Sequence, residues 1–320
     1  MSVLNYNISS QLKDYLQKID IIRDKILTTP IPREVEIRMR WEAQVERTYW
    51  SFSLADDSTT KPEVLDVLKE PEFAPLKGKE EIVNFYTALN FIRDNWLASN
   101  SRVKPSDIEK LYELTTKYQL GSKNKLSQKK EQEIKSFLNY IQQGENHPIL
   151  QAGIAYIQIY KINPYPNATD KIAILSAHLF LYKLGYDLRD MLVFEEFFRR
   201  ELASLRQSRE SVETHKTLTL WLEFFTYALG VQANKILQNI EAKKYKTDLP
   251  NTFSKLNSRQ KLIVSGLNNP GSRTTNGEVQ KKYGVSQITA SRDLAKLAKL
   301  RLVFRVGAGR STYYTKGMIF

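Results

Sequence analysis

The chain has 320 residues, of which 42% are hydrophobic and 26% charged, and its formal net charge is +13. This is the composition of an ordinary soluble globular protein, and the length suffices for two domains. The absence of cysteine excludes disulfides, thiolate metal sites and a cysteine nucleophile. No apolar run is long enough for a signal peptide or a membrane span, so we expect a cytoplasmic protein with no membrane partner.

The first 245 residues predict a succession of helices. Apolar residues recur three and four positions apart, without sustained alternation. The expected helices cover about residues 11–27, 33–49, 79–98, 106–118, 127–143, 148–160, 170–184, 192–208 and 216–243, with a break at 51–60. We therefore predict a mainly α protein whose helical domain spans residues 1–245, with its core at about 76–230.

Residues 246–254 are polar and interrupted by proline, so we interpret them as a linker to a second domain at residues 255–320. The pattern that follows predicts three short helices, at residues 258–267, 276–283 and 287–299. Gly284 provides a turn, Ser286 can cap the third helix, and the last apolar segments predict a β-hairpin. This layout is typical of a winged helix-turn-helix, a small α+β domain.

The positive charge is concentrated in this second domain. From Lys246 onward there are 14 Lys and Arg residues and three acidic ones, whereas the preceding 245 residues hold 34 basic and 32 acidic ones. Such asymmetry indicates that this end of the chain binds a polyanion. DNA is therefore the expected partner.

The helix at residues 287–299 is the candidate recognition helix. Its spacing places Ala290, Leu294 and Leu297 on one face, which we expect to pack on the first two helices. The residues that we predict to contact DNA lie on the other side of this helix or in the hairpin: Gln287, Ser291, Arg292, Lys296, Lys299 and Arg310. In such domains the recognition helix reads bases, and other cations contact phosphates. The alternative is a small helical module with a solvated basic face, used in dimerisation.

The segment from His147 to Leu188 comprises two strongly apolar stretches joined by the loop INPYPNATDK. It resembles the central helix, loop and helix of the Fic (Fido) family of nucleotide transferases, whose loop reads His-Pro-Phe-x-Asp/Glu-Gly-Asn-Gly-Arg. LKGKEEIVNFYTALNFI and THKTLTLWLEFF are similar to other helices of that family, and TASRDL and GAGRSTYY to a winged helix that often accompanies it. The resemblance extends over nearly the whole chain. It implies a helical Fic-like fold and, for an intact member, transfer of adenylyl from ATP to a protein hydroxyl.

The loop departs from the family pattern at most positions that carry chemistry. Asn163 replaces the histidine that takes the proton from the attacking hydroxyl, and an amide cannot act as a general base near neutral pH. Pro164 and Tyr165 keep only the shape of the Pro-Phe pair. The remaining motif positions are Asn167 for the metal-holding carboxylate, Ala168, Thr169 and Asp170 for Gly-Asn-Gly, and Lys171 for arginine.

A second departure concerns self-inhibition. Many family members pair an inhibitory glutamate with a second arginine after the loop, which also binds the γ-phosphate. The segment SFSLAD is similar to the inhibitory motif, but Ala55 stands at the glutamate and Ile174 at the arginine. Loss of both partners leaves no uncompensated buried charge, whereas loss of one would.

Two functions follow from these residues. The first is a DNA-binding transcription regulator on a catalytically degenerate Fic-like scaffold, a pseudoenzyme that requires no cofactor or metal and whose helical domain provides a homodimer contact, a partner surface or a ligand pocket. The alternative is an adenylyltransferase-like enzyme with altered chemistry, which would bind Mg-ATP and modify a target protein. In this alternative, His178 could face the pocket in which the Fic family binds ATP, although a lone helical histidine more often packs in a core. A third hypothesis is a partner that caps an active Fic relative.

Overall fold

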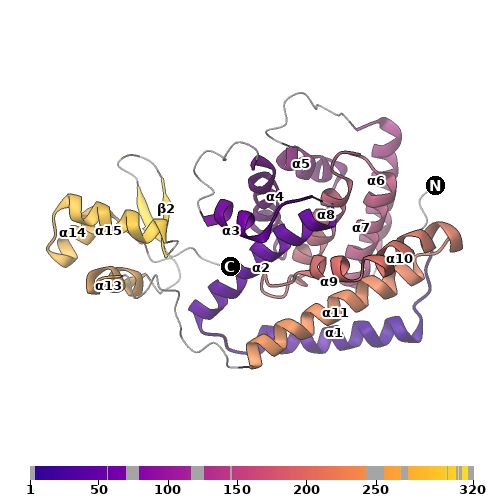
Figure 1. Cartoon of the computed structure of the whole chain (residues 1–320), viewed down its shortest axis with the longest axis horizontal. Helices are drawn as coiled ribbons and strands as arrows, with labels where there is room; N and C mark the ends of the chain where they lie inside the picture. Colours follow the sequence, from indigo (N-terminus) through magenta and orange to yellow (C-terminus); the bar gives the residue numbers. More distant parts are fainter. Residues whose placement is uncertain are drawn as a thin grey trace. The chain divides into compact units, whose positions relative to one another are not determined.

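The structure is a computed structural model that describes residues 4–55, 57–69, 79–116, 126–144, 146–242, 256–267, 273–300, 302–307, 309 and 312–315. Its contacts divide the chain into two compact units, Met1–Lys244 and Tyr245–Phe320 (Figure 1). Each unit buries its own set of apolar side chains. The expected linker at residues 246–254 lies outside the described residues. None of the described helices is long and apolar enough to cross a membrane.

The described residues of the N-terminal unit form helices and connecting loops. The helices are α1 (Ser10–Thr28), α2 (Arg33–Leu54), α3 (Lys61–Lys69), α4 (Glu80–Trp96), α5 (Pro105–Thr116), α6 (Gln128–Gln143), α7 (Pro148–Ile162), α8 (Thr169–Lys183), α9 (Phe194–Arg200), α10 (Leu202–His215) and α11 (Thr219–Glu241). The mainly α fold expected from the sequence is confirmed.

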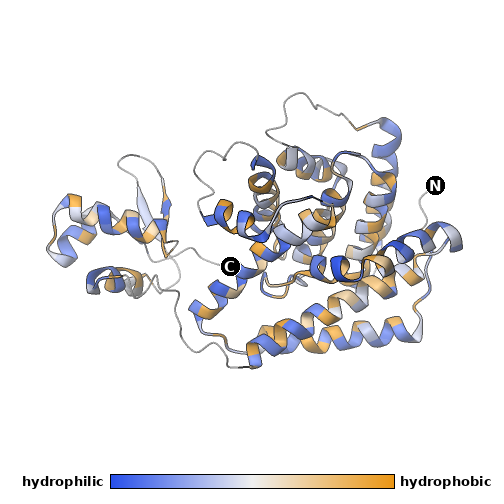
Figure 2. Ribbon diagram, in the orientation of Figure 1, coloured by the Kyte–Doolittle hydropathy of each residue, from blue (hydrophilic) through white to orange (hydrophobic). Residues whose placement is uncertain are grey.

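The centre of this unit is the antiparallel pair of α7 and α8. Residues 149–159 of α7 and 172–182 of α8 are all buried, so neither stretch has a face exposed to solvent. Helices that are apolar all round must be covered on every side, and α4, α5, α6 and α11 pack around this pair (Figures 1 and 2). Gly153 lets α11 approach, because a Cβ there would meet Leu222 and Phe225 at 3.0 Å.

Three details of this unit differ from the expectation. Helix α2 continues to Leu54, four residues into the predicted break at 51–60, because Phe52 is buried against Phe85. The short α3 was not predicted, although Val64, Val67 and Leu68 are buried at helical spacing. The single segment expected at 192–208 is two helices, α9 and α10, which are separated at Glu201, where φ is −105° and ψ is 43°.

The C-terminal unit contains α13 (Ser258–Gly266), β1 (Arg273–Thr274), α14 (Asn276–Tyr283), α15 (Gln287–Lys299), β2 (Phe304–Val306) and β3 (Tyr313–Thr315). The strands form an antiparallel sheet in the order β1-β3-β2. The three predicted helices and the hairpin are confirmed, and so is the burial of Ala290, Leu294 and Leu297. Strand β1 was not predicted, because two residues are too few to show alternation.

A buried ion pair joins α2 to the turn after α8. Nη2 of Arg47 lies 2.7 Å from Oδ1 of Asp190 and 2.6 Å from its carbonyl oxygen, and Nη1 donates to the hydroxyl of Tyr182 at 2.9 Å. Burial alone would lower the pKa of Arg47, but Tyr182 and Asp190 outweigh it and hold this pKa well above its ordinary value. The guanidinium therefore stays charged within the core.

The same turn has a strained backbone. Leu188, Arg189 and Asp190 are consecutive residues with φ between 51° and 63°, a left-handed region that costs roughly 1–2 kcal/mol for each non-glycine residue. The carboxylate of Asp187 accepts a hydrogen bond from the backbone N–H of Asp190 at 2.9 Å. Arg189 forms a bidentate ion pair with Glu36, in which Nε and Nη2 each donate to one carboxylate oxygen at 3.1 Å. These contacts, together with Arg47, stabilise the turn in its strained conformation.

Replacing Arg47 by Met should lower the free energy of unfolding of the helical unit by about 3–5 kcal/mol, because the carboxylate of Asp190 stays buried without its cation. Urea unfolding followed by tryptophan fluorescence measures this, since all four tryptophans precede residue 245. Lys110→Met, which removes an exposed pair with Glu113, is the control and should cost less than about 1 kcal/mol. Equal effects of the two changes would contradict this account of the buried pair.

Candidate functional site

The loop that connects α7 and α8 begins at Asn163, which is the C-cap of α7 with a left-handed φ of 47°. Its backbone N–H donates to the carbonyl of Ile159 at 3.0 Å, and its own carbonyl accepts from Nζ of Lys130 at 2.6 Å. Its side-chain oxygen accepts a hydrogen bond from the hydroxyl of Thr169. Asparagine tolerates this backbone conformation better than most residues, so Asn163 closes the loop structurally.

Tyr165 anchors the middle of the loop. Its ring is fully buried and stacks on Tyr112 of α5, with centroids 3.7 Å apart and planes at 3°. The hydroxyl of Tyr112 donates to Oδ1 of Asn167 at 3.4 Å, and Ala168 N–H donates to the carbonyl of Tyr165 at 2.9 Å. Burial raises the pKa of Tyr165, whose hydroxyl has no hydrogen-bond partner among the residues that the structure describes. The aromatic ring, and not the hydroxyl, therefore fixes the loop.

Asp170, in the first turn of α8, forms an ion pair with Arg209 of α10. Nη2 of Arg209 lies 2.9 Å from Oδ1 of Asp170 and also donates to the hydroxyl of Tyr156. The guanidinium lies over the ring of Tyr160, 3.9 Å from its centroid. Burial would lower the pKa of Arg209, but Tyr156 and Asp170 raise it above its ordinary value. The negative charge that the sequence places in the loop is thus compensated within the protein.

Lys171 is paired in the same way. Its Nζ lies 2.6 Å from Oε2 of Glu81 in α4 and 4.0 Å from the ring centroid of Phe52 in α2. Only 12% of the Lys171 side chain is exposed. A lysine held between a carboxylate and an aromatic face would have to leave both in order to bind a phosphate.

The two positions of the family's inhibitory pair carry no charge here. Ala55 is exposed at the end of α2, and Ile174 is fully buried on α8. The contact between α2 and α8 in this region is instead made by Lys171 and Phe52. A different pair of residues therefore joins the same two helices.

The residues of the loop do not fit a magnesium–triphosphate. Mg²⁺ is usually held by one or two carboxylates together with substrate phosphates. Asn167 is neutral, and the carboxylate of Asp170 is already paired with Arg209. Among the residues that the structure describes, no group of three or more His, Cys, Asp or Glu side chains is placed to hold a metal ion.

Two of the three histidines, His147 and His178, have structural surroundings. His178, which could have faced the ATP pocket in the alternative hypothesis, is packed in the core: it is 1% exposed, its Nε2 lies 2.5 Å from Oε1 of Glu195, and its ring packs on Phe194. Helical periodicity placed it on the face of Lys171 correctly, but α8 is buried on all sides, so that face continues into the core. His147 is the N-cap of α7, where its Nδ1 accepts from the N–H of Ile149.

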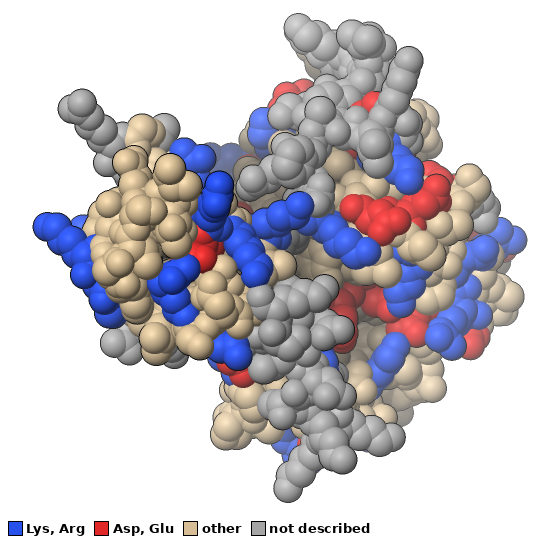
Figure 3. Space-filling model, turned by 60° about the vertical axis from the view of Figure 1, so that its left-hand side comes forward, with Lys and Arg blue, Asp and Glu red and all other residues tan. Residues whose placement is uncertain are grey.

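The second candidate site is the exposed face of α15. The expected DNA contacts that the structure describes are all exposed on this helix: Gln287, Ser291, Arg292, Lys296 and Lys299. Arg310 lies outside the described residues. On the visible face of the C-terminal unit, the left-hand body of Figure 3, Lys and Arg side chains predominate over acidic ones.

Sequence reasoning missed the polar contacts that hold this helix in place. Asp293 is buried, 2.5 Å from Nε of Arg259, and accepts from Gln260 at 2.7 Å, which ties α15 to α13. Asn276 donates to Ser291 at 2.7 Å and so ties α14 to α15. In the sequence, the buried role of Asp293 was indicated only by its position next to Leu294, on a helix face that is otherwise apolar.

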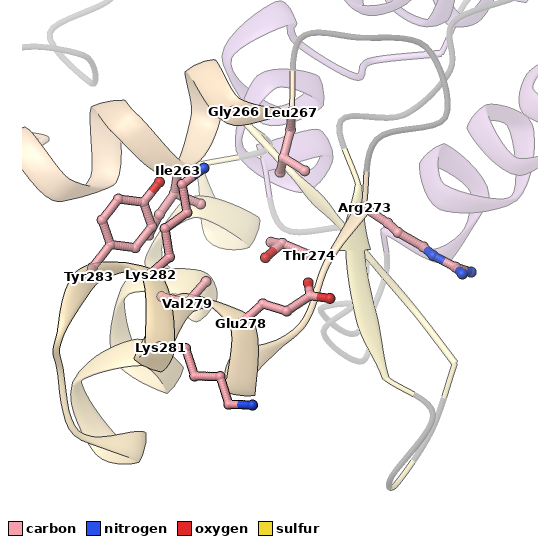
Figure 4. A pocket seen from close by; sticks show the side chains of 10 residues that line it. All are labelled: Ile263, Gly266, Leu267, Arg273, Thr274, Glu278, Val279, Lys281, Lys282 and Tyr283. Atoms are coloured by element: carbon pink, nitrogen blue, oxygen red, sulfur yellow. The ribbon is translucent and has the colours of Figure 1, made fainter.

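A cavity of about 470 Å³ lies between α13, β1 and α14. Ile263, Leu267 and Val279 provide its apolar wall, while the side chains of Arg273 and Lys281 point away from it (Figure 4). Two of the cationic groups at this cavity therefore do not face into it. Ligand sites combine an apolar cavity with a few convergent polar groups, so this cavity is a weaker candidate than the two sites above.

We predict that Tyr165→Phe leaves the stability of the helical unit unchanged or raises it by up to about 1 kcal/mol, because the change removes a buried hydroxyl that has no partner in the described part of the chain. Tyr165→Ala should cost about 3–5 kcal/mol, since it removes the ring that stacks on Tyr112. Urea unfolding followed by tryptophan fluorescence compares the two variants. A Tyr165→Phe variant as unstable as Tyr165→Ala would show that the hydroxyl is required.

No protein-family model and no curated protein matches the sequence. Solved structures do. A Fic family protein from Desulfovibrio desulfuricans superposes with a TM-score of 0.62 at 14% identity over 98% of each chain. A fragment of Fic-1 from C. elegans gives 0.56 at 15% identity over 70% of this chain and 71% of that one. A Fic domain containing signaling protein from Bacteroides thetaiotaomicron gives 0.55 at 17% identity, covering 73% of this chain and 98% of that one. At these identities the likeness establishes a Fic-like fold.

Proposed function

We propose that the protein is a DNA-binding transcription regulator built on a Fic-like scaffold whose loop no longer catalyses nucleotide transfer. The observation that carries the proposal is the exposed basic face of α15 on a compact unit of three helices and a three-stranded sheet. The element order α13, β1, α14, α15, β2, β3 is the order expected of a winged helix-turn-helix. In the proposal, α15 is the recognition helix.

The distribution of charge supports DNA as the partner. Two of the three acidic residues after position 245 serve the fold: Asp293 is buried against Arg259, and Glu278 caps α14. The 14 basic residues after position 245 far outnumber the three acidic ones, so the unit carries a net positive charge. A surface of this kind attracts the phosphate backbone from any sequence of DNA.

The proposed roles follow from position along α15. Gln287 and Arg292 lie in its N-terminal half, where side chains reach base edges, and an arginine can bind O6 and N7 of guanine with two hydrogen bonds. Lys296 and Lys299 follow in its last turns and would contact phosphates. We also assign a phosphate or minor-groove contact to Arg310 of the hairpin.

For the helical unit, the proposal is a scaffold without catalysis. Lys171 is paired with Glu81, Asp170 with Arg209, and Asn163 closes the loop, so the charged and polar groups of the motif are engaged within the protein. The unit would then provide a homodimer contact or a surface for a Fic-fold relative, and no cofactor is needed. The setting of this function is the cytoplasm.

The Fic-like fold also favours one alternative, an adenylyltransferase-like enzyme that transfers AMP from Mg-ATP to a hydroxyl of a target protein. That reaction would require Lys171 to leave Glu81 and Asp170 to leave Arg209. It would also require a proton acceptor other than Asn163. These three requirements make the regulator the function that the geometry supports best.

Arg292→Ala should weaken binding to a duplex selected from a randomised pool by about 1–3 kcal/mol, because one bidentate base contact is lost. Binding to a scrambled duplex should change far less. Fluorescence anisotropy at fixed salt measures both dissociation constants.

Lys110→Ala changes the net charge equally in the helical unit, so it is the matched control and should leave both constants unchanged. The slope of log K against log salt adds an independent check, at about 0.9 for each phosphate neutralised. If the Arg292→Ala variant keeps wild-type affinity and sequence preference, α15 is not the recognition helix.

A further inference from the structure

The second residue of α15, Ile288, is an isoleucine with 65% of its surface exposed. The apolar face of the helix is formed by Ala290, Leu294 and Leu297, which are buried, and Ile288 lies outside it. A single exposed apolar residue is common on protein surfaces. The position of this one is informative, because it lies on the helix proposed to enter DNA.

Ile288 has cationic and polar neighbours. Ser291 and Arg292 are three and four residues further along, so they share its side of the helix, and both are exposed. Lys296 continues the same side one turn later. A protein partner would be expected to cover a wider apolar surface, whereas an isolated apolar side chain beside cations matches the chemistry of a DNA groove.

The helix end that carries Ile288 is held rigidly. Ser286 caps it by accepting from the N–H of Thr289 at 3.3 Å. Asn276 of α14 donates to Ser291 at 2.7 Å and to the carbonyl of Gln287 at 3.4 Å. The Ile288 side chain therefore projects from a fixed backbone, which is what discrimination between two similar bases requires.

We infer that Ile288 recognises the 5-methyl group of a thymine in the major groove. That methyl is the apolar feature of the groove, and it distinguishes thymine from the other three bases. The inference rests on the proposed function and extends it to the base read at one position. Ile288 and Arg292 are four residues apart, or about 6 Å along the helix, so the thymine should lie about two base steps from the base that Arg292 contacts.

The test uses a duplex selected from a randomised pool by the full-length protein. Each thymine is replaced in turn by deoxyuridine, which removes only the methyl group, and the dissociation constant is measured by fluorescence anisotropy. One replacement should weaken wild-type binding by about fourfold, the value for burying one methyl-sized group. The Ile288→Ala protein should bind the unmodified duplex about as weakly as the wild-type protein binds the deoxyuridine duplex. The same thymine-to-deoxyuridine replacement should not change the dissociation constant of Ile288→Ala.

Two variants serve as controls. Leu262→Ala removes another exposed apolar side chain of the same unit, on α13, and should keep the wild-type response to deoxyuridine. Ile288→Val keeps a branched apolar side chain and should keep most of the response. If the response survives in Ile288→Ala, or no deoxyuridine weakens wild-type binding, this inference is overturned while the proposed function stands. If the pool yields no preferred duplex, both are overturned.

Discussion

The contact between α7 and α8 is the constraint on which the rest of the helical unit depends. Both helices are buried around their whole circumference, so they can exist only inside a layer of other helices. The loop between them is therefore held in a fixed place by the burial of both helices. This burial does not depend on which polar or charged groups the loop carries, so a Fic-like fold by itself does not fix the chemistry of the loop.

The charges that remain at the loop have partners from helices distant in sequence. Glu81 is 90 residues from Lys171, and Arg209 is 39 residues from Asp170. Each ion pair joins α8 to a neighbouring helix, so side chains that could have faced a nucleotide contribute to packing. The ring of Tyr165 has the same effect through Tyr112. In the C-terminal unit the polar contacts of Asp293 and Asn276 fix the proposed recognition helix and leave its basic face exposed.

Local patterns in the sequence were sufficient for most helices but not for their polar contacts. The bounds of α14 and α15 follow from spacing and capping residues, since Thr275, Ser286 and Gly284 act within one turn. Strand β1 has only two residues and depends on its pairing with β3, and α2 is extended by the packing of Phe52. The place of Lys171 at the start of α8 could be predicted from the sequence, but its pairing with Glu81 could not, because no spacing rule connects positions so far apart.

The most direct test of the account is calorimetric titration of the full-length protein with Mg-ATP, with ADP and GTP in parallel. The account predicts no binding tighter than about millimolar, because Lys171 and Asp170 are engaged by Glu81 and Arg209. Micromolar binding of Mg-ATP would contradict it. The loop would then be a working nucleotide site, and the protein an enzyme or a nucleotide-sensing regulator.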